Sequence, residues 1–178
     1  MDRRLLVLAL GMFAVGTDSF VVAGVLPEVA HSFHISIGAA GQMTTIYAAT
    51  TGILAPIIAA LAARVPRKTL LLTGLITFVV ANLGTAIAPT FTLAMVTRAL
   101  AGVAAAAFST TATSSAAAIV PPERRGAAIA AVIAGLSLST ALGAPLGALV
   151  GSLSGWHWTM VFVAALAAAS ALGVMALL

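Results

Sequence analysis

The sequence predicts an all-α membrane protein with six transmembrane helices, and three observations predict this class. Of its 178 residues, 62% are hydrophobic and 7% are charged, whereas soluble domains carry about 25% charged residues. Six spans of roughly 20 residues each would use most of the chain and leave only short connections. The charged residues gather in short clusters between apolar runs. A soluble catalytic domain is therefore excluded, and function must lie within the membrane.

The first apolar run, residues 5–27, is too long for the core of a secretory signal and contains Asp18, so it is a retained helix that ends at Pro27. The five expected connections are short and lie, in order, at residues 28–37, 62–68, 89–90, 120–125 and 151–156. The resulting single transmembrane domain, residues 1–178, has helices at residues 5–27, 38–61, 69–88, 91–119, 126–150 and 157–178.

Basic residues set the expected topology. The second and fourth connections and the N-terminus hold seven of the eight Lys and Arg residues: Arg3, Arg4, Arg64, Arg67, Lys68, Arg124 and Arg125. Because basic residues in short loops stay in the cytoplasm, both termini should be cytoplasmic in a multi-pass plasma-membrane protein. Trp156 and Trp158 are expected at the outer headgroup level. The last run is still apolar at Leu178, which favours a cut at the end of a six-helix half.

Two opposite charges are expected near mid-membrane. Asp18 lies nine residues before Pro27 and Arg98 nine residues after Pro89, which places both roughly 13 Å below the outer boundary. A central Asp or Arg costs about 2.5 to 3.5 kcal/mol on insertion scales, so both should face protein or a water-filled cavity. Tyr47 and Asn82 reach nearly the same depth, which predicts a polar layer lining one cavity.

This layer has two interpretations. Asp18 and Arg98 either join two helices structurally, since buried ion pairs need not be functional, or they form a substrate and proton site. Tyr47 either stacks on a substrate or makes an internal hydrogen bond. Asn82 is expected to join helices.

The fifth expected helix carries a regular stripe of small residues: Gly135, Ser139, Gly143, Gly147 and Gly151. This four-residue spacing places them along one side of the helix, where another helix can approach closely. Pro145 removes one backbone hydrogen bond and bends the helix. The segment is therefore either a rigid packing seam or a bending point used in conformational switching.

Other chemistries are not supported. His31 and His34 are too few ligands for a metal site, and the chain contains no Cys. No phosphate-binding loop or nucleophile elbow is present, so we expect no metal, no cofactor and no enzymatic activity. The basic clusters lack interleaved aromatic residues, which argues against nucleic-acid binding.

Five segments together resemble the N-terminal half of a major facilitator superfamily transporter of the drug:proton antiporter branch. They are residues 16–27, 61–68, 98–102, 121–126 and 143–147. The sequence departs from the usual motifs at Ala63 (usually Asp), Pro66 (usually Gly), Ala101 (often Gln) and Ala144 (usually Gly). The role of the missing Asp cannot be carried over, so Arg64, Arg67 and Lys68 of the cytoplasmic loop motif are expected to fix topology.

The resemblance implies half of a twelve-helix fold, built as a three-plus-three inverted repeat, with substrate bound between two halves. It implies proton-coupled export of small amphipathic molecules such as drugs, with Asp18 carrying the proton and Arg98 as its partner. Gly143, Pro145 and Gly147 would serve conformational switching. The implied partners are protons, a small-molecule substrate, the lipid bilayer, and a C-terminal six-helix half or a second copy. The alternatives are a sugar or metabolite exporter of the same fold and a non-transporting six-helix scaffold.

Overall fold

The computed structural model describes residues 2–61 and 65–178. Its helices are α1 (Arg3–Phe33), α2 (Ile37–Leu61), α3 (Arg67–Ala86), α4 (Phe91–Ile119), α5 (Arg125–Leu138), α6 (Ala144–Ser154) and α7 (Trp156–Leu177). A short 3-10 turn, η2 (Pro122–Arg124), leads into α5, and a π-helical turn, η3 (Ser139–Gly143), joins α5 to α6. In the described part of the chain, six helical segments are long and apolar enough to cross a membrane, and no strand occurs, which confirms the predicted fold class.

The first helix continues past Pro27, where the sequence predicted its end. It continues to Phe33, so most of the expected connection at residues 28–37 is helical. Val29 and Ala30 are buried there, and their packing favours the extra turns, because a Pro inside a membrane helix is tolerated when neighbouring helices supply contacts. His34 ends the helix in the left-handed conformation, with φ 54°, as is common at helix C-termini.

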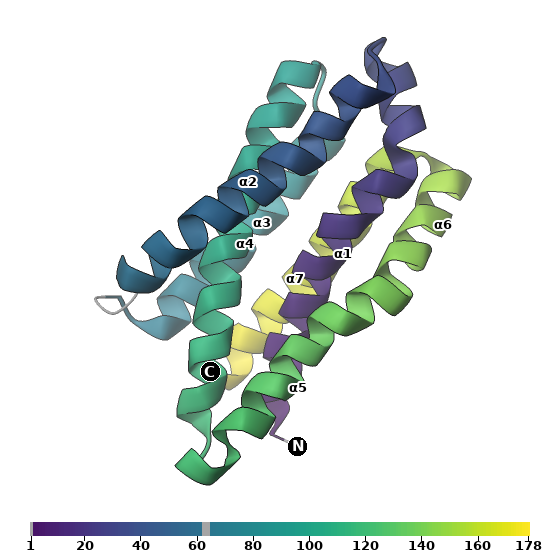
Figure 1. The fold of residues 1–178 in the computed structure, drawn as a ribbon. Coiled ribbons are helices and arrows are strands. Elements are labelled where there is room, and N and C mark those ends of the chain that lie inside the picture. The colour runs from purple at the N-terminus through teal and green to yellow at the C-terminus, as the bar shows by residue number, and fades with distance from the viewer. Residues whose placement is uncertain (1, 62–64) are drawn as a thin grey trace.

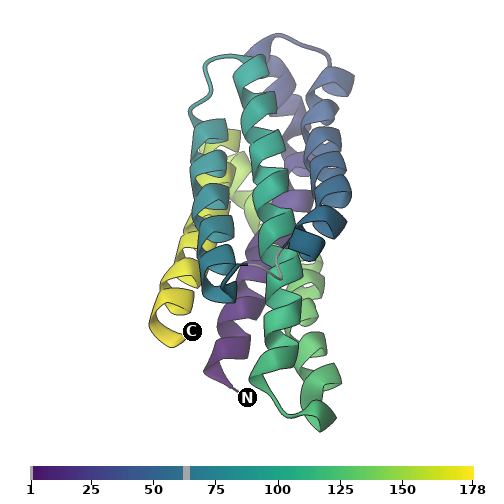
Figure 2. The same ribbon diagram turned by 90° about the vertical axis from the view of Figure 1, so that its left-hand side faces the viewer.

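The helices form one elongated bundle with the connections at its two ends. Both termini lie at one end, together with the connection between α4 and α5, as Figures 1 and 2 show. The α1–α2, α3–α4 and α6–α7 connections lie at the opposite end. We call the first the basic end, because Arg3, Arg4, Arg124 and Arg125 lie there.

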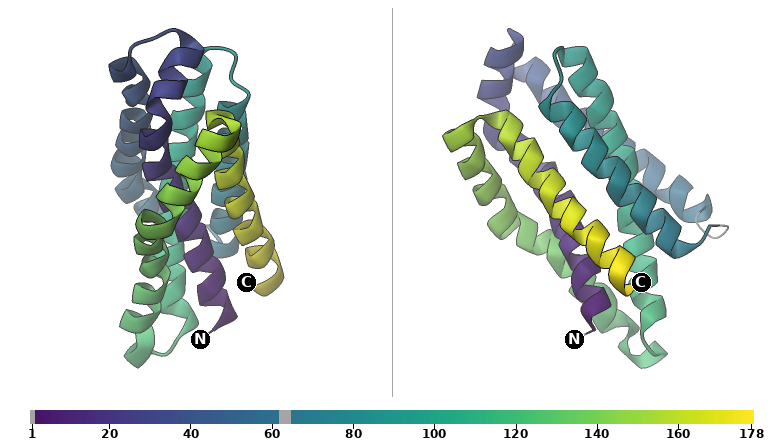
Figure 3. Two further views of the ribbon diagram at one scale, coloured as in Figure 1. Left: turned by 90° about the vertical axis from the view of Figure 1, so that its right-hand side faces the viewer. Right: turned by 180° about the vertical axis from the view of Figure 1, so that it is seen from behind.

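Helix α1 runs through the interior of this bundle and packs against α2, α5, α6 and α7. In the most apolar 18-residue stretch of α1, 61% of the residues are buried, whereas only 6% are buried in the corresponding stretch of α2. Helix α3 packs against α4 on one side and against α7 on the other (Figure 3). Five successive residues at the middle of α1, Ala14 to Asp18, are therefore buried.

The two tryptophans at the start of α7 differ from each other. Trp158 is exposed, whereas Trp156 is buried. The Trp156 indole donates a hydrogen bond to the hydroxyl of Ser32 at 3.0 Å, and its ring packs on Phe33. Trp156 is therefore packed inside the end of the bundle, because the longer α1 brings its last turn against this ring, and the headgroup level of both rings stays a prediction.

Candidate functional site

A buried ion pair lies at the centre of the bundle. Asp18 is the middle residue of α1, and Arg98 lies two turns into α4. Nη1 of Arg98 donates to both carboxylate oxygens of Asp18, at 2.8 and 2.9 Å, and to Oδ1 of Asn82 on α3 at 3.3 Å. All three residues have 0% exposure. The structure thus brings together three of the four residues expected in the polar layer.

The fourth, Tyr47 of α2, closes this cluster. Its ring centroid lies 4.6 Å from Cζ of Arg98, within range of a cation–π interaction. Its hydroxyl donates to the backbone carbonyl of Val15 on α1 at 3.2 Å. Of the two roles expected for Tyr47, the internal hydrogen bond is the one present. We call Asp18, Tyr47, Asn82 and Arg98 the central cluster.

Backbone contact between α2 and α4 allows Tyr47 to reach Arg98. A Cβ on Gly102 of α4 would overlap Oγ1 of Thr50 and lie 2.6 Å from the carbonyl oxygen of Tyr47. The hydroxyl of Thr51 in turn donates to the carbonyl of Gly102 at 3.1 Å. A residue larger than glycine at position 102 would therefore push α2, and the ring of Tyr47, away from Arg98.

The central cluster does not line an open cavity, which corrects the expectation from sequence. Asp18, Asn82 and Arg98 have no exposed surface, and Tyr47 is 3% exposed. The reason is the close packing of α2 on α4, which covers the guanidinium with the tyrosine ring instead of water. Depth along each helix was readable from the sequence, but which neighbour covers a residue was not.

The ion pair leaves two of the three guanidinium nitrogens of Arg98 without a hydrogen-bond partner. Its Nε and Nη2 atoms are buried and have no hydrogen-bond partner, so one nitrogen carries all three bonds to the cluster. Unpaired buried donors are costly, more so when charged. If Asp18 were neutralised by a proton, Arg98 would become a buried cation without a counter-charge, which destabilises a fold strongly. Protonation in this geometry therefore favours a rearrangement that brings water or another group to Arg98.

The predicted stripe of small residues packs against α1. Added Cβ atoms on Gly143, Gly147 and Gly151 would meet Thr17, Val21 and Val25 respectively. These pairs advance by four residues on both helices, as expected for two parallel helices in close contact. The seam passes directly beside Asp18, because Thr17 precedes it on α1.

The bend in this span begins before Pro145. Residues Ser139–Gly143 form a π-helical turn, in which the N–H of Ala144 donates to the carbonyl of Ser139, five residues back. In a regular α-helix each four-residue step overshoots a full turn by about 40°, so the stripe would drift away from α1. The wider π turn reverses part of this drift and keeps the stripe on α1. Pro145 follows it, and Pro145 is the residue that cannot donate to a carbonyl four residues earlier.

The loop-motif residues are only partly described. Arg64 lies outside the described residues. Arg67 and Lys68 are in the first turn of α3 and not in a connection, which corrects the expected bounds. Nη1 of Arg67 donates to the carbonyl of Ser114 at 3.2 Å, and Nζ of Lys68 donates to that of Met175 at 3.0 Å. These two side chains thus tie α3 to the ends of α4 and α7.

Two features of the site were not anticipated from sequence. Thr17 is fully buried between Asp18 and Gly143, and its hydroxyl donates to the carbonyl of Phe13 at 2.7 Å. Its four-residue spacing from Val21 and Val25 was the available signal. The π turn had no signal apart from the following proline. Among residues 2–61 and 65–178, no group of three or more His, Asp or Glu is placed to hold a metal ion.

Comparison with known proteins connects this geometry to a family. Residues 8–178 match the family model described as Major Facilitator Superfamily. The chain is 34% identical to the uncharacterized MFS-type transporter YfhI of Bacillus subtilis (strain 168), over 96% of this chain and 43% of that protein. It is also 34% identical to the chloramphenicol resistance protein of Streptomyces lividans, over 98% of this chain and 45% of that protein.

A solved structure shows the same fold. The crystal structure of the peptide transporter POT in complex with sulfate superposes with a TM-score of 0.85 at 18% identity, covering 99% of this chain and 38% of that one. The chain therefore spans less than half the length of the relatives it matches.

Proposed function

The chain belongs to the Major Facilitator Superfamily, a family of membrane transporters, and from this premise we propose that it forms the N-terminal half of a proton-coupled exporter of small amphipathic molecules such as drugs. The proposal has Asp18 as the proton-carrying acid and Arg98 as its electrostatic partner. The chloramphenicol resistance protein of Streptomyces lividans, at 34% identity, supports a drug-sized substrate.

The observation that carries the proposal is the desolvated Asp18–Arg98 pair in the middle of a membrane bundle. Ionisable residues at this depth are costly and usually mark ion or substrate pathways. The pair joins α1 to α4 at 2.8 Å with no exposed surface. A proton on Asp18 would break the charge balance of the central cluster, so proton binding and helix rearrangement would be coupled through Arg98.

Helix α6, which lies beside the central cluster, is the element proposed to move during transport. The π turn η3 packs on Thr17, next to Asp18, and π turns are often found at functional sites. We propose that Gly143, Pro145 and Gly147 let α6 change its angle to α1 when Asp18 changes its charge. Because Cβ atoms at both glycines would overlap α1 side chains, only small residues permit this sliding contact.

The surface of the bundle is suited to a second half. In the most apolar 18-residue stretches of α2 and of the span at residues 122–154, only 6% and 28% of the residues are buried. These fractions are lower than in the other spans of the described chain. In Figure 1 these two elements lie on either side of α1. We propose that this face meets a C-terminal six-helix half or a second copy, in the plasma membrane, with the basic end and both termini cytoplasmic.

The test is export driven by a pH gradient in proteoliposomes that contain this chain together with its C-terminal half, with chloramphenicol as the first substrate. Asp18→Asn should abolish gradient-driven export. The control Asp2→Asn makes the same chemical change outside the membrane, and Asn can still cap α1 as Asp2 does, so export should be unchanged. Full gradient-driven export by the Asp18→Asn protein would refute the proposed role.

The complete burial of the central cluster favours one alternative, a non-transporting scaffold in which the ion pair only joins α1 and α4. In that case Asp18→Asn would lower thermal stability, and neither the variant nor the native protein would respond to a pH gradient. Quenching of Trp156 or Trp158 fluorescence by an added substrate would argue against the scaffold.

A further inference from the structure

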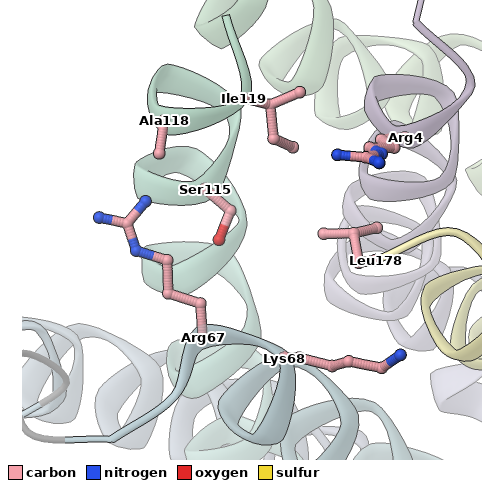
Figure 4. A pocket seen from close by; sticks show the side chains of 7 residues that line it. All are labelled: Arg4, Arg67, Lys68, Ser115, Ala118, Ile119 and Leu178. Atoms are coloured by element: carbon pink, nitrogen blue, oxygen red, sulfur yellow. The ribbon is translucent and has the colours of Figure 1, made fainter.

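A second polar site lies at the basic end, away from the central cluster. A pocket of about 310 Å³ opens between α1, α3, α4 and the end of α7. Figure 4 shows it lined by Arg4, Arg67 and Lys68, with Ser115, Ile119 and Leu178 completing the wall. The three cationic side chains come from two helices that are distant in sequence.

The cationic side chains at this pocket are exposed and make no ion pair in the part of the chain that the structure describes. Within the described chain, neither Arg4, Arg67 nor Lys68 has an acidic group within ion-pair distance. Arg67 and Lys68 each donate to a neutral backbone carbonyl, which satisfies hydrogen bonding without balancing charge.

The N-terminus of α3 makes the electrostatic potential at this pocket more positive. Arg67 and Lys68 begin α3, whose first turn contains no acid and whose N-cap, Pro66, provides no side-chain cap. A helix N-terminus carries a partial positive charge and favours anions. Two exposed cations at this position are therefore weakly disfavoured, a cost that a bound anion would offset.

Ser115 provides an independent sign of a ligand. It is 3% exposed, and its Oγ is buried without a hydrogen-bond partner, an uncommon state for a buried hydroxyl. In Figure 4 its oxygen points into the space between Arg67 and Leu178. A bound acceptor in the pocket would satisfy this donor.

We infer that this pocket binds a phosphate group, supplied by an anionic phospholipid headgroup or by a soluble phosphate ester. Phosphate oxygens accept from guanidinium, ammonium and hydroxyl donors together, and arginine matches phosphate geometry with paired N–H groups. The site lies at an end of the membrane helices, where basic pockets bind anionic headgroups. Arg4, Lys68 and the Ser115 hydroxyl are the binding groups, while the Arg67 guanidinium, which Figure 4 shows turned toward Ala118, adds positive charge beside the pocket.

The test measures the melting temperature of the purified protein with two probes. The first is inorganic phosphate in a neutral detergent, compared with chloride at equal ionic strength. The second is a nanodisc of phosphatidylcholine with and without phosphatidylglycerol. A ligand that binds the folded state raises its melting temperature, so at least one probe should stabilise the native protein.

Arg4→Gln should weaken this binding about fivefold or more, as expected for losing one cation near an anionic group. Arg3→Gln is the matched control, because it removes the neighbouring charge, which does not line the pocket, and it should retain binding. Ser115→Ala removes an unpaired buried hydroxyl, so without ligand it should melt at or above the native temperature while its ligand-induced rise shrinks.

Stabilisation by phosphatidylglycerol alone would identify the lipid as the source, and stabilisation by inorganic phosphate alone would identify a soluble ester. Both results support the phosphate site. No stabilisation by either probe, or an equal loss in the Arg3→Gln control, would overturn it.

Discussion

The close contact between Gly135 of α5 and the backbone of α1 leads to a specific prediction about stability. A Cβ on Gly135 would overlap the carbonyl oxygen of Ala9 and lie 2.9 Å from its carbonyl carbon. Both are backbone atoms of a buried helix, so no side-chain rotation can relieve the overlap. Gly135→Ala must therefore push α5 away from α1.

The expected magnitude follows from two opposing effects. Replacing a helical glycine by alanine gains about 0.5 to 1 kcal/mol of helix propensity. Overpacking typically costs about 1 to 3 kcal/mol, and separating the seam also weakens its dispersion contacts, because a gap of about 0.5 to 1 Å forfeits a quarter to a half of each contact. We expect a net loss of about 1 to 3 kcal/mol, with the upper part of the range if the gap extends to Gly143 and Thr17.

The matched control is Gly24→Ala on α1, where the added Cβ would lie 3.4 Å from Cβ of Ala148, an ordinary contact. This variant should be neutral or up to about 1 kcal/mol more stable. Unfolding in mixed detergent, followed by helical circular dichroism, gives both values on one scale. Equal stability of the two variants would refute the backbone contact at Gly135.

Three further predictions concern the central cluster and α4. Arg98→Gln leaves Asp18 as a buried unpaired charge and should cost about 3 to 5 kcal/mol; adding Asp18→Asn should recover part of this loss in a double-mutant cycle of unfolding free energies, and strictly additive losses would contradict the pairing. Tyr47→Phe removes the hydrogen bond to Val15 and should cost about 1 kcal/mol in the same assay, whereas no loss would argue against that bond. Thr111 is buried with its hydroxyl unpaired, so Thr111→Val should raise the melting temperature, and a lower one would reveal a partner for this hydroxyl.

The apolar runs and the breaks between them determined the number of spans, because a backbone inside a bilayer must satisfy its own hydrogen bonds and apolar runs of this length then become helices. The common depth of Asp18 and Arg98 was also readable, since rise per residue is constant along a helix. The two side chains do meet, but the count from Pro27 did not start at the true end of α1, which is Phe33. The stripe from Gly135 to Gly151 predicted close helix contact for the same reason, because its period is a property of one helix.

Tertiary packing decided what these local rules leave open. Whether Arg98 meets water or the ring of Tyr47 depends on how closely α2 approaches α4, and that distance is set at Gly102 by contacts between residues about 50 positions apart. The continuation of α1 past Pro27, the π turn before Pro145 and the grouping of Arg4 with Arg67 and Lys68 likewise arise from contacts between separate helices. Periodicity within one helix records which side is apolar, but it does not record which neighbour covers that side.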